Sequence, residues 1–424
     1  MKIYLVGGAV RDKLLQLPIK DRDYVVVGAS PCQLKAKGYK EVGKDFPVFL
    51  HPETGDEYAL ARTERKSGKG YKGFSVDFSP EITLEQDLIR RDLTINAIAQ
   101  DAEGNIIDPY QGQRDLQQKT LRHVSPAFAE DPLRVLRVAR FAARYHHLGF
   151  TIAQETLTLM QQLVANDELS YLTPERVWAE TEKALATQSP HIYFLSLREC
   201  GALKVLMPEL ERLWGVPNPE KWHPEIDTGI HTMMVLEQAA HKTDNLEVRF
   251  AALVHDLGKG ITPKEEWPQH KGHEESGVDI IKNLCQRLKV PNSYQNLATL
   301  VSRYHLHCHK MFELRSNTIF KVLKGLGAFR NPKLLQQFVI SCEADFNGRL
   351  YNEDKAYPQA QLLLGCYDAC KDIDTQSLIE KGYEGQKLGQ QIDQERIRLI
   401  KSYISNEKAI ADKDHYQTWL QTKQ

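Results

Sequence analysis

The sequence lacks a net charge, a paired-cysteine motif and a long apolar run. Its 55 lysines and arginines are balanced by 56 aspartates and glutamates, so no overall positive field indicates a nucleic-acid-binding protein. Seven cysteines, an odd number without a CxxC pair, argue against a disulfide framework or a cysteine zinc site and favour a reducing cytoplasm. Arg11 and Asp12 interrupt the first apolar stretch, so we expect no export or membrane segment.

The 424 residues exceed one ordinary core and predict about three domains of an α+β protein. Short β-rich runs such as IYLVGG, DYVVVG and EYALAR alternate with turns, and Ser30 and Pro31 predict the N-cap and first position of a helix. After Tyr110 the pattern becomes amphipathic and helical, and the Pro- and Gly-rich residues 215–229 predict a linker. We expect an α/β head with a small mixed sheet over 1–113, a helical neck and body over 114–214, a second helical domain over 215–350 and a C-terminal helical segment over 351–424.

A pattern suited to phosphate and metal binding lies near the amino terminus. Gly7 and Gly8 let the backbone approach a triphosphate, and the helix that follows carries Arg11. Asp21 and Asp23 open the second strand pattern, where i, i+2 spacing puts both carboxylates on one face and allows them to share Mg²⁺ ions. An Asp-x-Asp pair alone is more often a solvated strand entry. The glycines and the arginine beside it favour two-metal chemistry, in which one ion lowers the pKa of an attacking hydroxyl and the other stabilises the leaving pyrophosphate.

Two charged segments follow. In RRDLTINAIA, residues 90–99, Arg90 and Arg91 are candidates for phosphate contacts and Asp92 for a ribose hydroxyl, although RRD alone also fits a charged helix surface. Residues 114–150 carry seven lysines and arginines against three acids. Four of these arginines fall within an arc of roughly 120° on one predicted helix face, and such a stripe with little acid beside it favours an anionic partner over a solvated face: they are Arg134, Arg137, Arg140 and Arg144.

The helical half carries a histidine pattern. GIHTMMVLEQAA places His231 on a helix, and RFAALVHDLGKG places His255 beside Asp256 after an apolar run. Imidazoles with carboxylates suit Mg²⁺, Mn²⁺ or Ni²⁺ rather than a thiolate-type zinc site. A single histidine in such a region is more often packed or exposed than a ligand, but the adjacent His-Asp pair followed by Gly-Lys favours a metal. Further candidates are His270, His273, His305, His307 and His309.

These motifs together resemble the nucleotidyltransferase superfamily, and within it the class II group of tRNA nucleotidyltransferases and bacterial poly(A) polymerases. The histidine pattern resembles the HD phosphohydrolase superfamily. The resemblance spans nearly the whole chain. It implies a nucleotidyltransferase head with a helical neck and body, an all-α HD domain, and addition of the CCA end of tRNA from CTP and ATP with Mg²⁺.

The resemblance also implies roles for individual residues of the head and neck. Asp92 would bind the ribose. Asp131 and Arg134 of the EDxxR motif would act as an amino-acid template by hydrogen bonding to the Watson–Crick edge of the incoming base. The complete set of nucleotide-site residues expected here is Gly8, Arg11, Arg91, Asp92, Asp131, Arg134, Arg137 and Arg140.

In the HD domain the implied metal ligands are His231, His255, Asp256 and Asp345, and the implied activities are phosphatase, 2′-nucleotidase and 2′,3′-cyclic phosphodiesterase, with Ni²⁺ or another divalent metal. Two other functions remain open: a poly(A) polymerase, and a metal phosphohydrolase whose head only binds RNA. Poly(A) polymerases of this group commonly end in a basic tail, whereas residues 401–424 hold four lysines against three acids. We expect tRNA, CTP and ATP as partners, no membrane association, and a monomer or homodimer.

Overall fold

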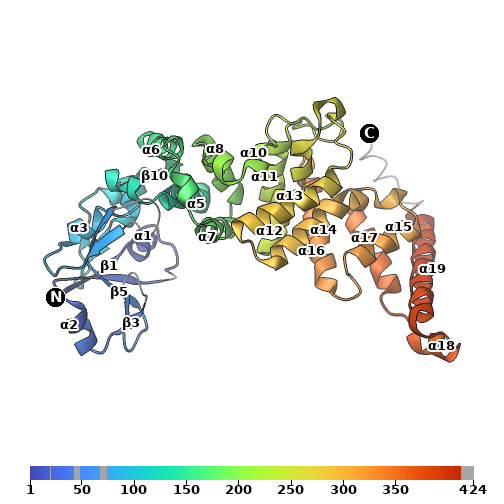
Figure 1. Ribbon diagram of the computed structural model, residues 1–424, viewed down its shortest axis with the longest axis horizontal. Helices are drawn as coiled ribbons and strands as arrows, with labels where there is room; N and C mark the ends of the chain where they lie inside the picture. The colour runs from blue at the N-terminus through green and yellow to red at the C-terminus, as the bar shows by residue number, and fades with distance from the viewer. Residues whose placement is uncertain (20, 43–47, 67–73, 412–424) are drawn as a thin grey trace. The chain divides into compact units, whose positions relative to one another are not determined.

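The computed structural model describes residues 1–19, 21–42, 48–66 and 74–411 (Figure 1). The chain divides into two compact units, Met1–Pro208 and Glu209–Gln424. The finer division at residues 113, 214 and 350 stays a prediction. Within the described ranges, no helix combines the length and apolar character needed to cross a membrane.

Unit 1 begins with a seven-stranded mixed sheet of order β3-β4-β5-β2-β1-β8-β9. Strand β2 runs parallel to β5, and the other neighbours are antiparallel. A separate antiparallel pair, β6–β7, follows β5 in the chain. The strands are β1 Lys2–Val6, β2 Asp23–Val27, β3 Lys40–Val42, β4 Val48–Leu50, β5 Glu57–Leu60, β6 Thr63–Lys66, β7 Phe74–Asp77, β8 Ala99–Gln100 and β9 Ile106–Ile107.

Short helices flank this sheet: α1 Gly8–Leu14, α2 Pro31–Ala36 and α3 Leu84–Leu88. The predicted cap of α2 is confirmed, because the Ser30 hydroxyl accepts a hydrogen bond from the Gln33 amide while the Gln33 side chain accepts one from the Ser30 amide. Val6, Val25 and Leu88 belong to one buried cluster that joins the sheet to α3. This packing fixes the first turn of α1 and the start of β2 at neighbouring ends of the two central strands.

The remainder of unit 1 is helical apart from a short parallel pair, β10 Thr120–Leu121 with β11 Thr151–Ile152. The predicted amphipathic helix is α5, which packs against α7 and α8 through buried residues such as Val135, Leu136 and Ala139. Its charged residues therefore lie on the opposite side of the helix. The helices are α4 Gly112–Gln117, α5 Leu133–Tyr145, α6 Gln154–Ala165, α7 Pro174–Leu185, α8 Pro190–Glu199 and α9 Ala202–Leu206, with α10 Pro208–Glu211 at the unit boundary.

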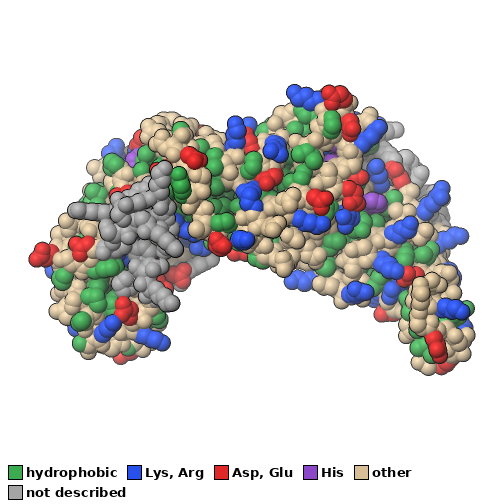
Figure 2. Space-filling view, in the orientation of Figure 1, with side chains coloured by type: hydrophobic (Ala, Val, Ile, Leu, Met, Phe, Trp, Pro, Cys, Tyr) green, Lys and Arg blue, Asp and Glu red, His purple; other side chains and the backbone are tan. Residues whose placement is uncertain are grey.

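Unit 2 is all-α. Helices α11, α12, α13, α14 and α16 pack against one another, and α15 and α17 pack against the long α19. Of residues 215–229, expected as a linker, 215–227 form a loop of unit 2 closed by a β-bridge between Pro217 and Asp227, and the last two belong to the first turn of α11. On the face shown in Figure 2, basic and acidic side chains of this unit are interspersed. The helices are α11 Thr228–Lys242, α12 Leu246–Val254, α13 His273–Leu288, α14 Asn292–His309, α15 Ser316–Gly325, α16 Pro332–Asn347, α17 Pro358–Cys370, α18 Thr375–Glu380 and α19 Gly385–Ala411.

Candidate active sites

A cavity of about 590 Å³ in unit 1 brings together the eight residues of the predicted nucleotide site and the two predicted magnesium ligands. Arg90, the other candidate for phosphate contacts, is not in its lining and instead donates to Asp87 and to the Arg62 carbonyl. The lining comes from the β1–α1 turn, the start of β2, the segment after α3, and helices α5 and α7. Residues that lie far apart in the sequence therefore face one space. They are Gly7, Gly8, Arg11, Asp21, Asp23, Arg91, Asp92, Asn96, Asp131, Leu133, Arg134, Arg137, Arg140, Phe141, Arg144, Arg176 and Lys183.

The carboxylate pair lies at the start of β2. Asp23 is the first residue of the strand, but Asp21 precedes it. The prediction that both carboxylates lie on one strand face is therefore wrong for Asp21. Both still line the cavity. Desolvation by the surrounding protein raises the pKa of Asp23, and the charge of Asp21 adds to this effect against the opposing charge of Arg91. Within the described ranges neither carboxylate has a hydrogen bond or an ion pair, an arrangement that suits oxygen ligands for Mg²⁺.

The glycine turn before α1 brings Arg91 close to the backbone. Gly7 has φ +65°, and a Cβ there would lie 2.9 Å from Nη1 of Arg91. The other guanidinium nitrogen, Nη2, donates to buried Asp87 at 3.2 Å, which fixes the arginine at this turn. A side chain at position 7 would both strain the backbone and displace the cation.

Arg11 is 4% exposed and rigidly held. Its Nε donates to Asp12 at 2.8 Å, its Nη1 donates to Asn96 at 2.5 Å, and its guanidinium lies 5.2 Å from the centroid of the Phe141 ring. The guanidinium therefore reaches the cavity as a fixed charge. Asn96 was not singled out from the sequence, although it lies within the segment RRDLTINAIA.

Asp92 is held in its ionised form. One carboxylate oxygen accepts hydrogen bonds from the amide of Leu93 and the side chain of Asn96, both at 2.8 Å, and the other accepts from Nε of Arg137 at 2.7 Å. Although burial acts to raise the pKa of Asp92, the charge of Arg137 and these hydrogen bonds hold it well below its usual range. The carboxylate is therefore a permanent acceptor facing the cavity.

The four arginines of α5 line the cavity, but the expectation that little acid accompanies them is wrong. Arg137 pairs with Asp92, and the other two ion pairs of the stripe join Arg140 to Glu180 at 2.5 Å and Arg144 to Asp12 at 3.0 Å. These acids lie on other elements, between 40 and 132 residues away in the sequence. Repulsion along the stripe therefore gives no argument for an anionic partner.

The EDxxR motif lies where 3-10 helix η2 (Pro126–Glu130) meets α5. Asp131 accepts a hydrogen bond from the Leu133 amide at 3.1 Å and pairs with Arg176 of α7 at 2.8 Å. Arg134 donates from its two terminal nitrogens to the carbonyls of Ala127 and Arg90, each at 2.6 Å. Both template candidates are thus fixed in orientation. Arg176 and Glu180 were not singled out from the sequence. Their i, i+4 spacing in TPERVWAETEK would have predicted that both lie on one face of a helix.

Arg134→Ala should lose discrimination among nucleotides while retaining metal binding. Because two carbonyls lose their donor, we also expect a loss of about 1–3 kcal/mol in the free energy of unfolding, detectable by thermal denaturation. Comparing CMP, AMP, UMP and GMP incorporation at a temperature where the variant is folded measures selectivity. Arg114→Ala, an exposed arginine on α4 that does not line this cavity, serves as control. Unchanged selectivity would contradict the template role.

The predicted metal ligands of unit 2 form one buried cluster. His231 Nε2 lies 3.1 Å from Oδ1 of Asp345, and His255 Nε2 lies 3.2 Å from Oδ2 of Asp256 and 3.8 Å from Oδ1 of Asp345. Among the described residues, their ligand atoms fall into three groups, each within 4.8 Å: His223, Glu225 and His231; His231, His255 and Asp345; and Asp256, His273 and His305. The last two histidines were candidates in the sequence but were not among the four implied ligands.

The orientation of three imidazoles fits a metal. Nδ1 of His255, His273 and His305 each lies 2.7–2.8 Å from a main-chain carbonyl three residues earlier. Since a carbonyl only accepts, Nδ1 carries the proton and Nε2 presents a lone pair to the cluster. Nε2 of His255, Nε2 of His273 and Oδ1 of Asp256 are buried and have no hydrogen-bond partner among the residues that the structure describes. Buried acceptors that face one another suit a shared cation.

Lys259 and Glu225 support this cluster. Lys259 is 7% exposed and donates from Nζ to Asp256 at 2.6 Å and to Asn218 at 2.9 Å. Although burial acts to raise the pKa of Asp256, the protonated form of His255 and the charge of Lys259 hold it well below its usual range. The neutral form of His255, with the lone pair on Nε2, is the one that can bind a metal. Glu225 was missed in the sequence: its Oε1 lies 2.9 Å from Nδ1 of His231. The histidine just before it in HPEIDTGIH was an available signal.

Glu225→Gln should weaken metal binding by about 10- to 100-fold, the usual effect of losing a carboxylate behind a ligating histidine. The neutral amide keeps the size of the side chain and can still accept a hydrogen bond from His231, but it lacks the negative charge that increases the basicity of the imidazole. Calorimetric titration of the metal-free protein with Ni²⁺ measures the change. Glu209→Gln, which alters a surface ion pair with Arg287 in the same unit, is the matched control. Equal affinities in both variants would exclude this role for Glu225.

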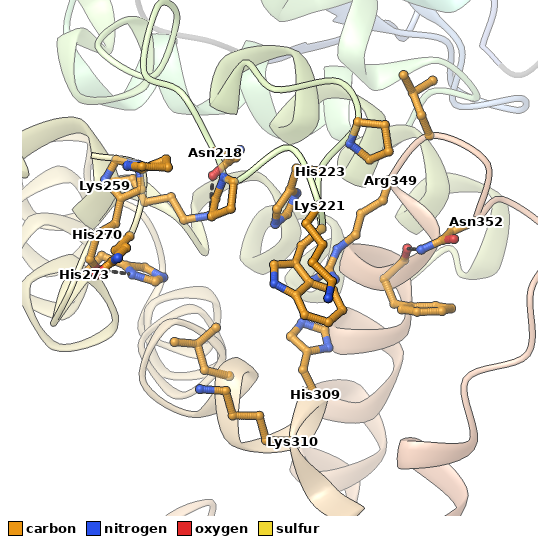
Figure 3. A pocket seen from close by; sticks show the side chains of 18 of the residues that line it. Asn218, Lys221, His223, Lys259, His270, His273, His309, Lys310, Arg349 and Asn352 are labelled. Carbon is orange, nitrogen blue, oxygen red and sulfur yellow. Dashed lines mark hydrogen bonds between the residues drawn. The ribbon is translucent and has the colours of Figure 1, made fainter. Parts of the chain in front are cut away.

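A cavity of about 630 Å³ in unit 2 adjoins the cluster. In Figure 3 the side chains of Lys259, His273, His309 and Arg349 point toward its middle. Its lining includes five basic side chains and one acidic side chain, Glu313, a charge balance suited to a phosphate ester. The five are Lys221, Lys259, Lys310, Arg349 and Lys355. The loop expected as a linker thus contributes to the site through residues 218–219 and 221–224.

Three domain-family models match the chain. They are the poly A polymerase head domain over residues 3–122, a probable RNA and SrmB-binding site of polymerase A over 149–213, and the HD domain over 228–333. With the geometry above, they define a nucleotidyltransferase head joined to helical RNA-binding and HD regions.

Relatives define the family more narrowly. A multifunctional CCA protein of Shewanella frigidimarina is 58% identical over 403 residues, which are 95% of this chain and 97% of that protein. One of Pseudoalteromonas atlantica is 57% identical over 405 residues, 96% of this chain and all of the relative. The chain belongs to the family of multifunctional CCA proteins.

Solved structures agree with the fold. A CCA-adding enzyme in complex with CTP has a TM-score of 0.65 at 21% identity and covers 97% of this chain and 91% of its own. The Thermotoga maritima CCA-adding enzyme complexed with tRNA has a TM-score of 0.62 at 20% identity, and the match covers 96% of this chain and 91% of that enzyme. The predicted α+β class, with a mixed-sheet head followed by helical regions and an HD domain, is confirmed.

Proposed function

We propose that the chain adds and repairs the 3′-terminal CCA of tRNA from CTP and ATP without a nucleic-acid template. One observation carries this proposal: Asp21 and Asp23, carboxylates that form no ion pair with any described residue, share a cavity with the eight residues of the predicted nucleotide site. The reaction joins the 3′ oxygen of tRNA to the α-phosphorus of the nucleotide while the bond to pyrophosphate breaks. Family membership at 57–58% identity favours this function over a poly(A) polymerase or a binding-only head.

In this proposal Asp21 and Asp23 hold two Mg²⁺ ions, which when bound would lower the pKa of the attacking hydroxyl and neutralise the leaving pyrophosphate. The nearby arginines, including Arg11, Arg91 and Arg140, bind the triphosphate, and Asp92 accepts a hydrogen bond from the ribose. Asp131 and Arg134 present fixed hydrogen-bonding groups to the base edge. Because every tRNA must be accepted, we expect binding through shape and phosphates rather than sequence.

We further propose that the HD domain is a metal-dependent phosphohydrolase with phosphatase, 2′-nucleotidase and 2′,3′-cyclic phosphodiesterase activities. The buried Nε2 atoms without partners and the basic cavity beside them support this. Ni²⁺ or another divalent ion would supply an activated water there. The seven cysteines are free thiols, which suits a reducing cytoplasm, where such an activity would trim damaged RNA ends before resynthesis.

The decisive assay supplies the protein with Mg²⁺, CTP, ATP and a tRNA that lacks its last three nucleotides. We expect addition of C, C and A followed by a stop. Long adenosine tails would instead identify a poly(A) polymerase, and no addition at all would leave only the phosphohydrolase.

A further inference from the structure

Two exposed aromatic side chains line the basic cavity of unit 2. Trp222 is 45% exposed and Tyr351 is 74% exposed, and both border the same space as His273 and His309. Single exposed aromatic residues are common on protein surfaces and need no explanation. Two on one cavity, beside basic groups and a buried metal-type cluster, indicate a ligand with both a flat apolar part and an anionic part.

Trp222 is presented by a loop that hydrogen bonds hold in place. The Trp222 amide donates to the Pro219 carbonyl at 2.9 Å, and the Asn218 amide donates to the Ile226 carbonyl at 2.7 Å across the base of the loop. Within the described ranges the indole contacts no other aromatic ring, while Nζ of Lys221 lies 5.2 Å from its centroid. The loop therefore holds a half-exposed indole that has the ammonium of Lys221 over one of its faces.

Tyr351 adopts a backbone conformation that bulky residues rarely take, with φ +69°. The surrounding backbone is fixed on both sides: the Leu350 amide donates to Glu225 at 3.3 Å, the Tyr351 amide donates to Glu353 at 3.1 Å, and the Asn347 side chain donates to the Asn352 carbonyl at 2.6 Å. This strained conformation leaves the ring exposed instead of packed. Strain retained at a cavity is typical of a binding position.

We propose that Trp222 and Tyr351 form a nucleobase-binding subsite of the HD cavity, so that the domain takes nucleoside phosphates and cyclic phosphates at an RNA 3′ end in preference to small phosphate esters. The inference rests on the proposed hydrolase function, to which it adds the residues that select nucleotides over smaller phosphate esters. Stacking on an aromatic side chain accepts any base, because every base has a π face. Lys221 and Arg349 lie on the same cavity and can bind the phosphate.

The test compares 2′,3′-cyclic AMP with the 2′,3′-cyclic phosphate of methyl riboside, which has the same reacting group and no base. We expect Trp222→Ala to raise the KM for cyclic AMP by about 5- to 150-fold, the range for loss of one stacking contact, with little change for the riboside. Tyr351→Ala should act in the same direction, and Trp222→Phe should retain most of the affinity. Ile261→Ala, which removes an exposed apolar side chain outside the cavity lining, is the control.

A binding measurement separates this inference from the hydrolase function. Adenosine 2′-monophosphate should quench the tryptophan fluorescence of the wild type and of Trp178→Phe, a variant in the other unit, but not that of Trp222→Phe. Quenching without any hydrolysis would overturn the hydrolase function and support the subsite. Equal KM values of the wild type for the two substrates, or a loss in Trp222→Ala that is the same for both, would overturn the subsite.

Discussion

Changing both Asp21 and Asp23 to asparagine should reduce CMP addition to a shortened tRNA by about 10³-fold or more. Asparagine keeps the shape of each side chain but removes the negative charge that attracts divalent cations, and metal stabilisation of the transition state contributes several kcal/mol. The measurement is the single-turnover rate of CMP incorporation at saturating CTP. Phosphohydrolase activity in the same preparation should be unchanged, because the two sites lie in separate compact units.

Asp56→Asn provides a matched control for this change. Asp56 lies between β4 and β5 of the same head, accepts a hydrogen bond from Thr54 at 2.9 Å, and is not among the cavity residues. It should add CMP at the normal rate. If the double variant did so as well, the carboxylate pair would have no part in catalysis.

His255→Ala should reduce hydrolysis of 2′,3′-cyclic AMP in the presence of Ni²⁺ or Mg²⁺ by at least about 10²-fold. This loss exceeds the usual effect of removing a residue that only hydrogen-bonds to a metal ligand. His255 is 1% exposed and its Nε2 faces both Asp256 and Asp345, so its loss removes a metal-ligating atom from the centre of the cluster. CCA addition should continue, which also shows that the variant is folded in the head.

The matched control is His307→Ala. His307 lies on α14 between His305 and His309 but belongs to none of the three groups of metal-type ligands found among the described residues. It should hydrolyse cyclic AMP normally. Hydrolysis by His255→Ala at the wild-type rate would remove the HD cluster from the chemistry.

Features encoded by neighbouring residues could be predicted from the sequence. The strand that begins at Asp23, the cap at Ser30 and the helix that carries the arginines each depend on a short pattern, and each is confirmed by the structure. The i, i+2 spacing did not place Asp21 correctly, because this residue lies before the strand rather than on its face. The residue still lines the cavity, since the turn that precedes β2 faces the same space.

Long-range pairing could not be predicted. Nothing near Arg140 or Arg144 in the sequence indicates Glu180 or Asp12, because these contacts depend on how α5 packs against α7 and α1. The HD cluster could be predicted only in part. Its His-Asp pair is a local motif, whereas the positions of His273 and His305 beside Asp256 depend on the packing of α13 against α14. Whether each of these residues acts as proposed stays a prediction.

The most direct test of the central claim, that Asp21 and Asp23 hold metal ions on the reacting phosphate, uses CTP with sulfur in place of one α-phosphate oxygen. Mg²⁺ prefers oxygen ligands, whereas softer divalent ions accept sulfur. If Asp21 and Asp23 hold these ions, one diastereomer is incorporated slowly with Mg²⁺ and much faster with Mn²⁺ or Cd²⁺, and the Asp21→Asn, Asp23→Asn double variant shows no such rescue. Equal rates for both diastereomers with every metal would contradict this claim.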